Sequence, residues 1–148
     1  VFATKNKNKR QHKSVRNYID IEKENKLDKI ETYYKFAKDV NNIKLKSLKK
    51  LNNILLENKK IIGYGAPAKA TTVLNYFGID DNYFQYVLED SEIKHNKYIP
   101  ETNIQIKSKN EINVDKYEYI LVLAWNFFEA IVDNNKTKFK KSKFIKLK

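Results

Sequence analysis

Apolar side chains recur at helical spacing over the first 57 residues. A first helix is predicted to begin at Ser14, because serine is among the residue types that cap helix N-termini. A longer helix is predicted from about residue 28 to 57, where apolar residues recur every three or four positions. No Gly or Pro precedes residue 63, although the Asn pairs at 41–42 and 52–53 are candidate interruptions.

The pattern changes after Asn58. Short apolar runs that alternate with helical segments predict strands at 60–62, 84–88, 104–106, 117–124 and 143–147. Gly78 follows the helical segment that comes after the strand at 60–62, and it suits the C-terminal end of that helix. Such alternation is typical of parallel sheets. The predicted fold class is therefore α/β: a small Rossmann-like parallel sheet flanked by helices and preceded by a long helical segment.

Charge divides unevenly along the 148 residues, which carry a net charge of +12. Residues 1–60 hold +10, residues 61–133 hold −5 and residues 134–148 hold +7. Because the predicted core is acidic and the basic residues are mostly Lys, a solvated basic surface explains the total better than nucleic-acid binding. No apolar run is long enough to span a bilayer, so no membrane partner is expected.

Cysteine is absent, which excludes a disulfide scaffold and any thiolate metal site and fits a reducing, cytoplasmic compartment. His12 and His95 are the only histidines, too few for a His-rich metal centre. The pKa of histidine suits acid–base work, but His95 has no nucleophile or carboxylate at a recognisable spacing and is interpreted as a surface residue. No catalytic and no metal-ligating residue is therefore predicted in this chain.

A glycine turn follows the first predicted strand, and Gly63-x-Gly65-x-x-Ala68 matches the looser form of the dinucleotide fingerprint. Gly63 would permit a tight turn, and Gly65 would let a phosphate approach the backbone. Pro67 suits the first turn of the next helix, whose N–H groups, together with Lys69, would attract an anion. The alternative is that these glycines serve only close packing.

Two further strand ends carry polar or aromatic candidates. Glu89 or Asp90 stands where the fingerprint expects a ribose-binding acid, unless it is an ordinary loop acid or an N-cap. Trp125 would form the wall of a pocket or the edge of the core, and Asn126 would contact a ligand or cap a helix. Because the carboxyl ends of parallel strands share one edge, these residues are expected to meet at a ligand site there. The loop 91–100 is expected to overhang this edge.

Four motifs in fitting order resemble one family, the C-terminal domain of S-adenosylmethionine-dependent C-methyltransferases that act on nucleotide-linked deoxysugars. The motifs are Gly63-Tyr64-Gly65-Ala66-Pro67-Ala68-Lys69-Ala70, Tyr86-Val87-Leu88-Glu89-Asp90-Ser91-Glu92-Ile93-Lys94, Tyr98-Ile99-Pro100 and Leu121-Val122-Leu123-Ala124-Trp125-Asn126. The sequence departs from the family pattern at Glu101-Thr102, where Gly-Thr is usual, and at Lys94-His95-Asn96, where Lys-Gln-Gly is common.

The resemblance implies that this domain helps to hold a sugar nucleotide, while the zinc ligands, the catalytic base and the S-adenosylmethionine site lie upstream of Val1. It implies a domain organisation with the end of the preceding domain and a linker at 1–13, a helical connector at 14–57 and the Rossmann-like C-terminal domain at 58–148. Residues 1–4 would then be the last strand of the upstream methyltransferase domain. The candidate substrate-binding residues are Gly63, Tyr64, Gly65, Ala66, Pro67, Lys69, Glu89, Asp90, Ser91, Lys94, Tyr98, Trp125 and Asn126.

Two other interpretations stay open at the sequence level. One is a stand-alone NAD- or nucleotide-binding module without methyltransferase activity, and the other is a purely structural domain. The long, tyrosine-lined helix would serve a homodimer as well as an interdomain contact.

Overall fold

The computed structural model describes residues 3–6, 10 and 12–147, and the remaining positions (1–2, 7–9, 11 and 148) lie outside the description. The chain divides into two compact units, Val1–Asn41 and Asn42–Lys148. None of the helices in the described part of the chain is long and apolar enough to cross a membrane.

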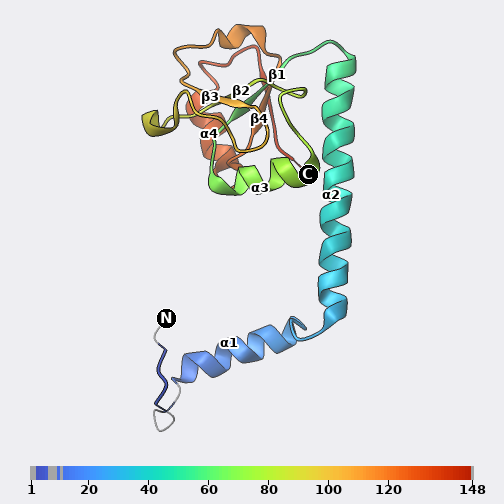
Figure 1. Cartoon of the computed structure of the whole chain (residues 1–148), viewed down its shortest axis with the longest axis vertical. Helices are drawn as coiled ribbons and strands as arrows, with labels where there is room; N and C mark the ends of the chain where they lie inside the picture. Colours follow the sequence, from blue (N-terminus) through green and yellow to red (C-terminus); the bar gives the residue numbers. More distant parts are fainter. Residues whose placement is uncertain (1–2, 7–9, 11, 148) are drawn as a thin grey trace. The chain divides into compact units, whose positions relative to one another are not determined.

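The second unit is built on a five-stranded sheet in the order β3-β2-β1-β4-β5, with every neighbouring pair parallel (Figure 1). The strands are β1 (Ile61–Tyr64), β2 (Tyr86–Leu88), β3 (Gln105–Lys107), β4 (Tyr119–Val122) and β5 (Lys143–Ile145). This confirms the predicted Rossmann-like α/β fold. The chain adds strands outward from β1 to β3 and then returns to β4 beside β1, so the strand order reverses between β1 and β4.

Successive strand residues point to opposite faces, and both faces are covered. On one face Ile61 and Leu121 pack with helix α3 (Ala68–Phe77) and with the C-terminal part of α2 (Ile30–Leu56). On the other face Ile62 packs with Phe139 and helix α4 (Phe128–Asn135). Every residue of β1 is consequently buried.

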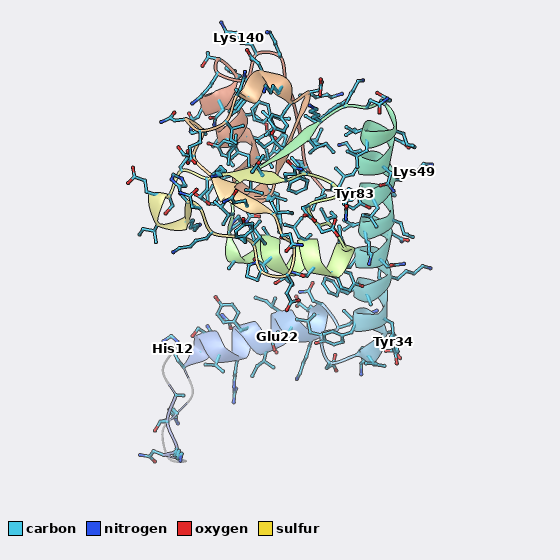
Figure 2. The ribbon with its side chains drawn as sticks, turned by 45° about the horizontal axis from the view of Figure 1, so that its top comes forward. His12, Glu22, Tyr34, Lys49, Tyr83 and Lys140 are labelled. Atoms are coloured by element: carbon cyan, nitrogen blue, oxygen red, sulfur yellow. The ribbon has the colours of Figure 1, made fainter. Side chains whose placement is uncertain are left out.

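The covering helices bury residues four and three positions apart, the spacing of one helical face. Leu51 and Leu74 are the deepest apolar members on α2 and α3. The full buried sets are Ser47, Leu51 and Ile54 on α2, and Ala70, Leu74 and Phe77 on α3. Figure 2 shows Lys49 projecting from α2 away from the sheet, whereas Tyr83 lies on the side of α2 that faces the sheet and packs against the core.

Helix α2 is unbroken over 27 residues, so neither Asn pair interrupts it. Helix α1 (Lys13–Glu24) precedes it, and none of the described residues of Val1–Asn41 is buried. The predicted capping residue was wrong: His12 caps α1, and its Nδ1 accepts from the Ser14 N–H at 3.3 Å. The strand predicted at residues 1–4 is not formed by Ala3 and Thr4, and residues 1–2 lie outside the description.

Candidate functional site

Packing explains both glycines of the Gly63-x-Gly65 motif. Gly63 lies inside the strand, where a Cβ would come within 2.5 Å of the Val87 Cγ2 atom. Gly65 has a φ of +83°, and a Cβ on it would lie 2.9 Å from the Ala124 Cβ. The prediction of a tight turn at Gly63 was wrong: this glycine lies within β1, where a side chain would collide with Val87 of β2. The left-handed turn falls at Gly65 instead.

The backbone N–H groups of the turn already have acceptors within the chain. The Gly65 N–H donates to the Leu88 carbonyl at 2.7 Å, and the Ala66 N–H donates to the Glu89 Oε2 at 2.9 Å. Pro67 is the N-cap of α3, one residue before the predicted position, and provides no side-chain cap. The first N–H groups of a helix have no acceptor within it. The capacity for an anion therefore lies at the start of α3, on the Ala68 and Lys69 N–H groups.

Lys69 and Trp125 come together from the two sides of the strand-order reversal. The Lys69 Nζ lies 4.4 Å from the centroid of the Trp125 ring, a cation–π contact. Lys69 belongs to the helix that follows β1, whereas Trp125 begins the 3-10 helix Trp125–Phe127 after β4. Both side chains are half-buried, and Asn126 beside them is exposed. Open α/β sheets bind their ligands outside the carboxyl ends of strands at such a reversal.

Glu89 turns inward onto the glycine turn. Its Oε1 accepts from the N–H groups of Asp90 and Ser91 at 3.0 and 3.1 Å, and its Oε2 accepts from Ala66 and from the Lys94 Nζ at 3.1 Å. Burial raises the pKa of this carboxyl, but the surrounding donors outweigh it and the pKa is lowered overall. Lys94 also donates to the Ala66 carbonyl at 3.2 Å. The Glu89 carboxylate, which was expected to bind ribose, is thus hydrogen-bonded to backbone N–H groups of the chain itself.

Tyr64 and Asp90 belong to a separate cluster, on the α4 face of the sheet. The Tyr64 hydroxyl donates to the Asp90 Oδ2 at 2.9 Å and lies 3.4 Å from the Asn135 Oδ1. The Lys109 Nζ lies 3.2 Å from that hydroxyl and 2.7 Å from the Asp90 Oδ1. Burial, first among the causes, raises the pKa of the Tyr64 hydroxyl. Neither Lys109 nor Asn135 was predicted: Lys109 follows a strand end as Glu89 does, whereas nothing in the sequence distinguishes Asn135.

The loop 91–100 overhangs the carboxyl edge only in its first half. His95 lies there, with its Nε2 2.8 Å from the Glu89 carbonyl. The chain then turns back along β3, and Tyr98 pairs antiparallel with Gln105, at the amino end of that strand. Tyr98, with 58% of its surface exposed, is therefore not brought together with the other candidates.

Among the residues that the structure describes, no group of three His, Asp or Glu side chains is arranged to hold a metal ion. Apart from Tyr98, the candidate residues fall into three sets. Lys69, Trp125 and Asn126 gather at the strand-order reversal. The glycine turn with Glu89, Ser91 and Lys94 forms the second set. Tyr64 and Asp90 form the third set, on the face of the sheet that α4 covers.

A five-stranded parallel sheet with helices packed on both faces defines a Rossmann-like α/β domain. Residues 1–147 match the family described as the C-methyltransferase C-terminal domain, and the chain belongs to this family. The C-methyltransferase NovU of Streptomyces niveus is 27% identical over 104 residues, which are 70% of this chain and 25% of that protein. The chain thus aligns with about a quarter of this relative's length, and the resemblance predicted from the four motifs is confirmed.

Proposed function

We propose that this chain is the substrate-side domain of a sugar C-methyltransferase. The complete enzyme would transfer a methyl group from S-adenosylmethionine to a carbon next to the keto group of a nucleotide-linked deoxysugar. Family membership supports the methyltransferase assignment. The observation that carries the role of this domain is the Lys69–Trp125 pair beside the start of α3, at the edge where such sheets bind ligands.

The chemistry available at this edge suits a sugar diphosphate. Lys69 supplies a full positive charge, and the first N–H groups of α3 supply donors and the positive end of the helix dipole. The half-exposed Trp125 ring offers an apolar surface beside these groups. Together they bind and orient the substrate, while the acidity of the sugar carbon comes from its neighbouring keto group. No residue of this chain is proposed to transfer a proton.

S-adenosylmethionine does not fit the glycine turn of this chain. The N–H groups of Gly65 and Ala66 are already bonded, and Glu89, which would bind ribose hydroxyls, is held inward. The same arrangement argues against the stand-alone NAD-binding alternative. We therefore place the methyl-donor site and the catalytic groups in an upstream domain of the same, cytoplasmic enzyme.

The helices of Val1–Asn41 support the proposal of an upstream partner. Large apolar side chains are exposed along α1 and the first part of α2, including Tyr18, Tyr34 and Phe36, which are 69%, 69% and 66% exposed. The unit Val1–Asn41 carries such side chains and has no buried position among its described residues, so packing on another domain would stabilise it. We propose that the upstream methyltransferase domain covers them. A homodimer is the other candidate for the same surface.

Trp125 is the chain's sole tryptophan, so its fluorescence reports directly on the proposed site. Titration with a nucleoside diphosphate is expected to change this fluorescence and to shift the amide signals of Ala68 and Lys69. Lys69→Gln is expected to weaken binding about tenfold, because one charge-assisted contact is lost. Lys49→Gln, which removes an exposed lysine from α2, is the matched control and should leave binding unchanged.

Two results would contradict the proposal. One is the absence of any amide shift at Ala68 and Lys69 with millimolar ligand. The other is tighter binding of NAD than of the nucleoside diphosphate, which would favour a dinucleotide module.

A further inference from the structure

We propose that Glu89 is a specificity-determining residue that acts as an internal anion: its carboxylate occupies the Ala66 N–H of the glycine turn and closes the turn to the pyrophosphate of a dinucleotide. The proposal refines the proposed function, because it confines the substrate's anion to Lys69 and the start of α3. The closure of the turn itself depends only on hydrogen bonds within the chain, whatever the substrate is.

Four donors surround the Glu89 carboxylate. Three backbone N–H groups and one ammonium group lie 2.9 to 3.1 Å from its two oxygens. The side chain is only 14% exposed. The Ala66 N–H comes from the glycine turn, whereas the Asp90 and Ser91 N–H groups directly follow Glu89 after β2. Converging backbone N–H groups are the arrangement with which proteins hold phosphate oxygens. In this chain a carboxylate of the protein fills the arrangement.

The rest of the glycine turn is also occupied by contacts within the chain. The Gly65 N–H, the donor preceding Ala66, bonds to the end of β2, and Ala124 lies against the Gly65 Cα. Lys94 ties the Ala66 carbonyl to the same carboxylate. A dinucleotide pyrophosphate would therefore have to displace Glu89, and it would meet that negative charge. Beyond the turn, the N–H groups at the start of α3 remain for the substrate.

Chemical rescue tests this role. In the Glu89→Ala protein the vacated donors are expected to accept formate, which should move the amide signals of Ala66 and Ser91 toward their original positions. Inorganic pyrophosphate should shift the same two signals in this variant. In the unaltered protein pyrophosphate should shift Ala68 and Lys69 and leave Ala66 and Ser91 in place.

Glu89→Gln provides the second variant in case Glu89→Ala does not fold. It keeps the size of the side chain but removes the charge, so pyrophosphate should now shift the Ser91 amide. Asp81→Asn is the control, because it removes the same charge from the exposed connection that enters the amino end of β2. This control should behave as the unaltered protein does.

The proposal is overturned if pyrophosphate shifts Ala66 as strongly as Lys69 in the unaltered protein. It is also overturned if a folded Glu89 variant responds neither to formate nor to pyrophosphate at Ala66 and Ser91. If Ala68 and Lys69 of the unaltered protein fail to respond to any diphosphate, the proposed function fails. The rescue by formate still decides the role of Glu89 in that case.

Discussion

Gly65 and Gly78 both adopt positive φ, but only Gly65 has a neighbour in the way. A Cβ at Gly65 would lie 2.9 Å from the Ala124 Cβ, whereas nothing lies within 4 Å at Gly78. The left-handed conformation alone costs a residue with a side chain about 1 to 2 kcal/mol. Overpacking typically adds about 1 to 3 kcal/mol.

We therefore expect Gly65→Ala to lower the free energy of unfolding by more than Gly78→Ala does. Urea unfolding followed by circular dichroism measures both. Equal losses would mean that Ala124 moves aside without cost, and that backbone conformation alone requires glycine at position 65.

The lowered pKa of Glu89 predicts that the stability of the protein depends on pH. Its pKa is lowered in the folded chain, so the protonated form is disfavoured there more than in the unfolded chain. The stabilisation is present above the unfolded pKa of about 4.3 and is lost as the pH falls through the lower folded pKa. Asp90, Glu111 and Glu118 have lowered pKa values as well, so the difference between proteins is the informative quantity.

The unaltered protein is thus expected to lose more stability than Glu89→Gln between pH 6 and pH 3. Urea midpoints at several pH values in this window provide the measurement. Parallel pH profiles of the two proteins would show that the contacts of Glu89 contribute no net stability.

At the scale of single residues, the place of a candidate residue at the end of a strand could be predicted from the sequence. The orientation of its side chain could not. The placement of Glu89 after a parallel strand follows from the alternation of apolar runs. Its inward turn depends on three backbone N–H groups and on Lys94, and their arrangement exists only once the loop has folded. Trp125 is likewise placed by its strand, while its partner Lys69 comes from a helix more than fifty residues earlier.

At the scale of elements, Tyr64 links strand β1 to helix α4. Its hydroxyl group lies between Asp90 and the buried side chain of Asn135. Removing one partner of a buried polar group costs about 1 to 3 kcal/mol, because the other partner stays desolvated. Tyr64→Phe is therefore expected to destabilise the protein by an amount in that range and to speed amide hydrogen exchange in α4.

Tyr76→Phe is the matched control for this prediction, because Tyr76 is 53% exposed on α3. Unchanged exchange in α4 for Tyr64→Phe would show that the apolar contacts of Phe139 and its neighbours position this helix without the hydroxyl.

Helices and strands were predictable to the extent that their patterns are local. The period of α2 and the apolar run of β4 are both visible in short windows of sequence. The return of residues 96–99 along β3 was not, because it depends on backbone bonds such as Asn96 N–H to Ile106 C=O at 2.9 Å. These bonds draw Tyr98 to the wrong end of the strand for the expected site.

At the scale of the whole molecule, the division falls within α2, between Asn41 and Asn42. Ser47, Leu51 and Ile54, which lie after this point, are buried in the second unit. The sequence-based boundary at 57–58 remains a prediction about domains of the longer enzyme. The pattern of α2 alone cannot show which of its turns are covered, because its apolar residues continue on both sides of Asn41.

A fragment of residues 42–148 is expected to unfold cooperatively, with a urea midpoint close to that of the full chain. A peptide of residues 1–41 should show little helix by circular dichroism, because short helices without packing are marginal in water. Loss of cooperative unfolding in the longer fragment would mean that the first unit stabilises the sheet.

Helix α2 is continuous across the division between Asn41 and Asn42. Its length therefore sets the angle about the helix axis between side chains on the two sides of this division. Each residue of an α-helix advances about 100° and 1.5 Å. One residue inserted between Asn41 and Asn42 would rotate Tyr33 and Phe36 by about 100° relative to Leu51 and Ile54, without altering any contact of the sheet. An insertion of eleven residues, close to three full turns, would nearly restore the original phase. The angle between these two sets of apolar side chains along α2 therefore depends on the number of residues between them.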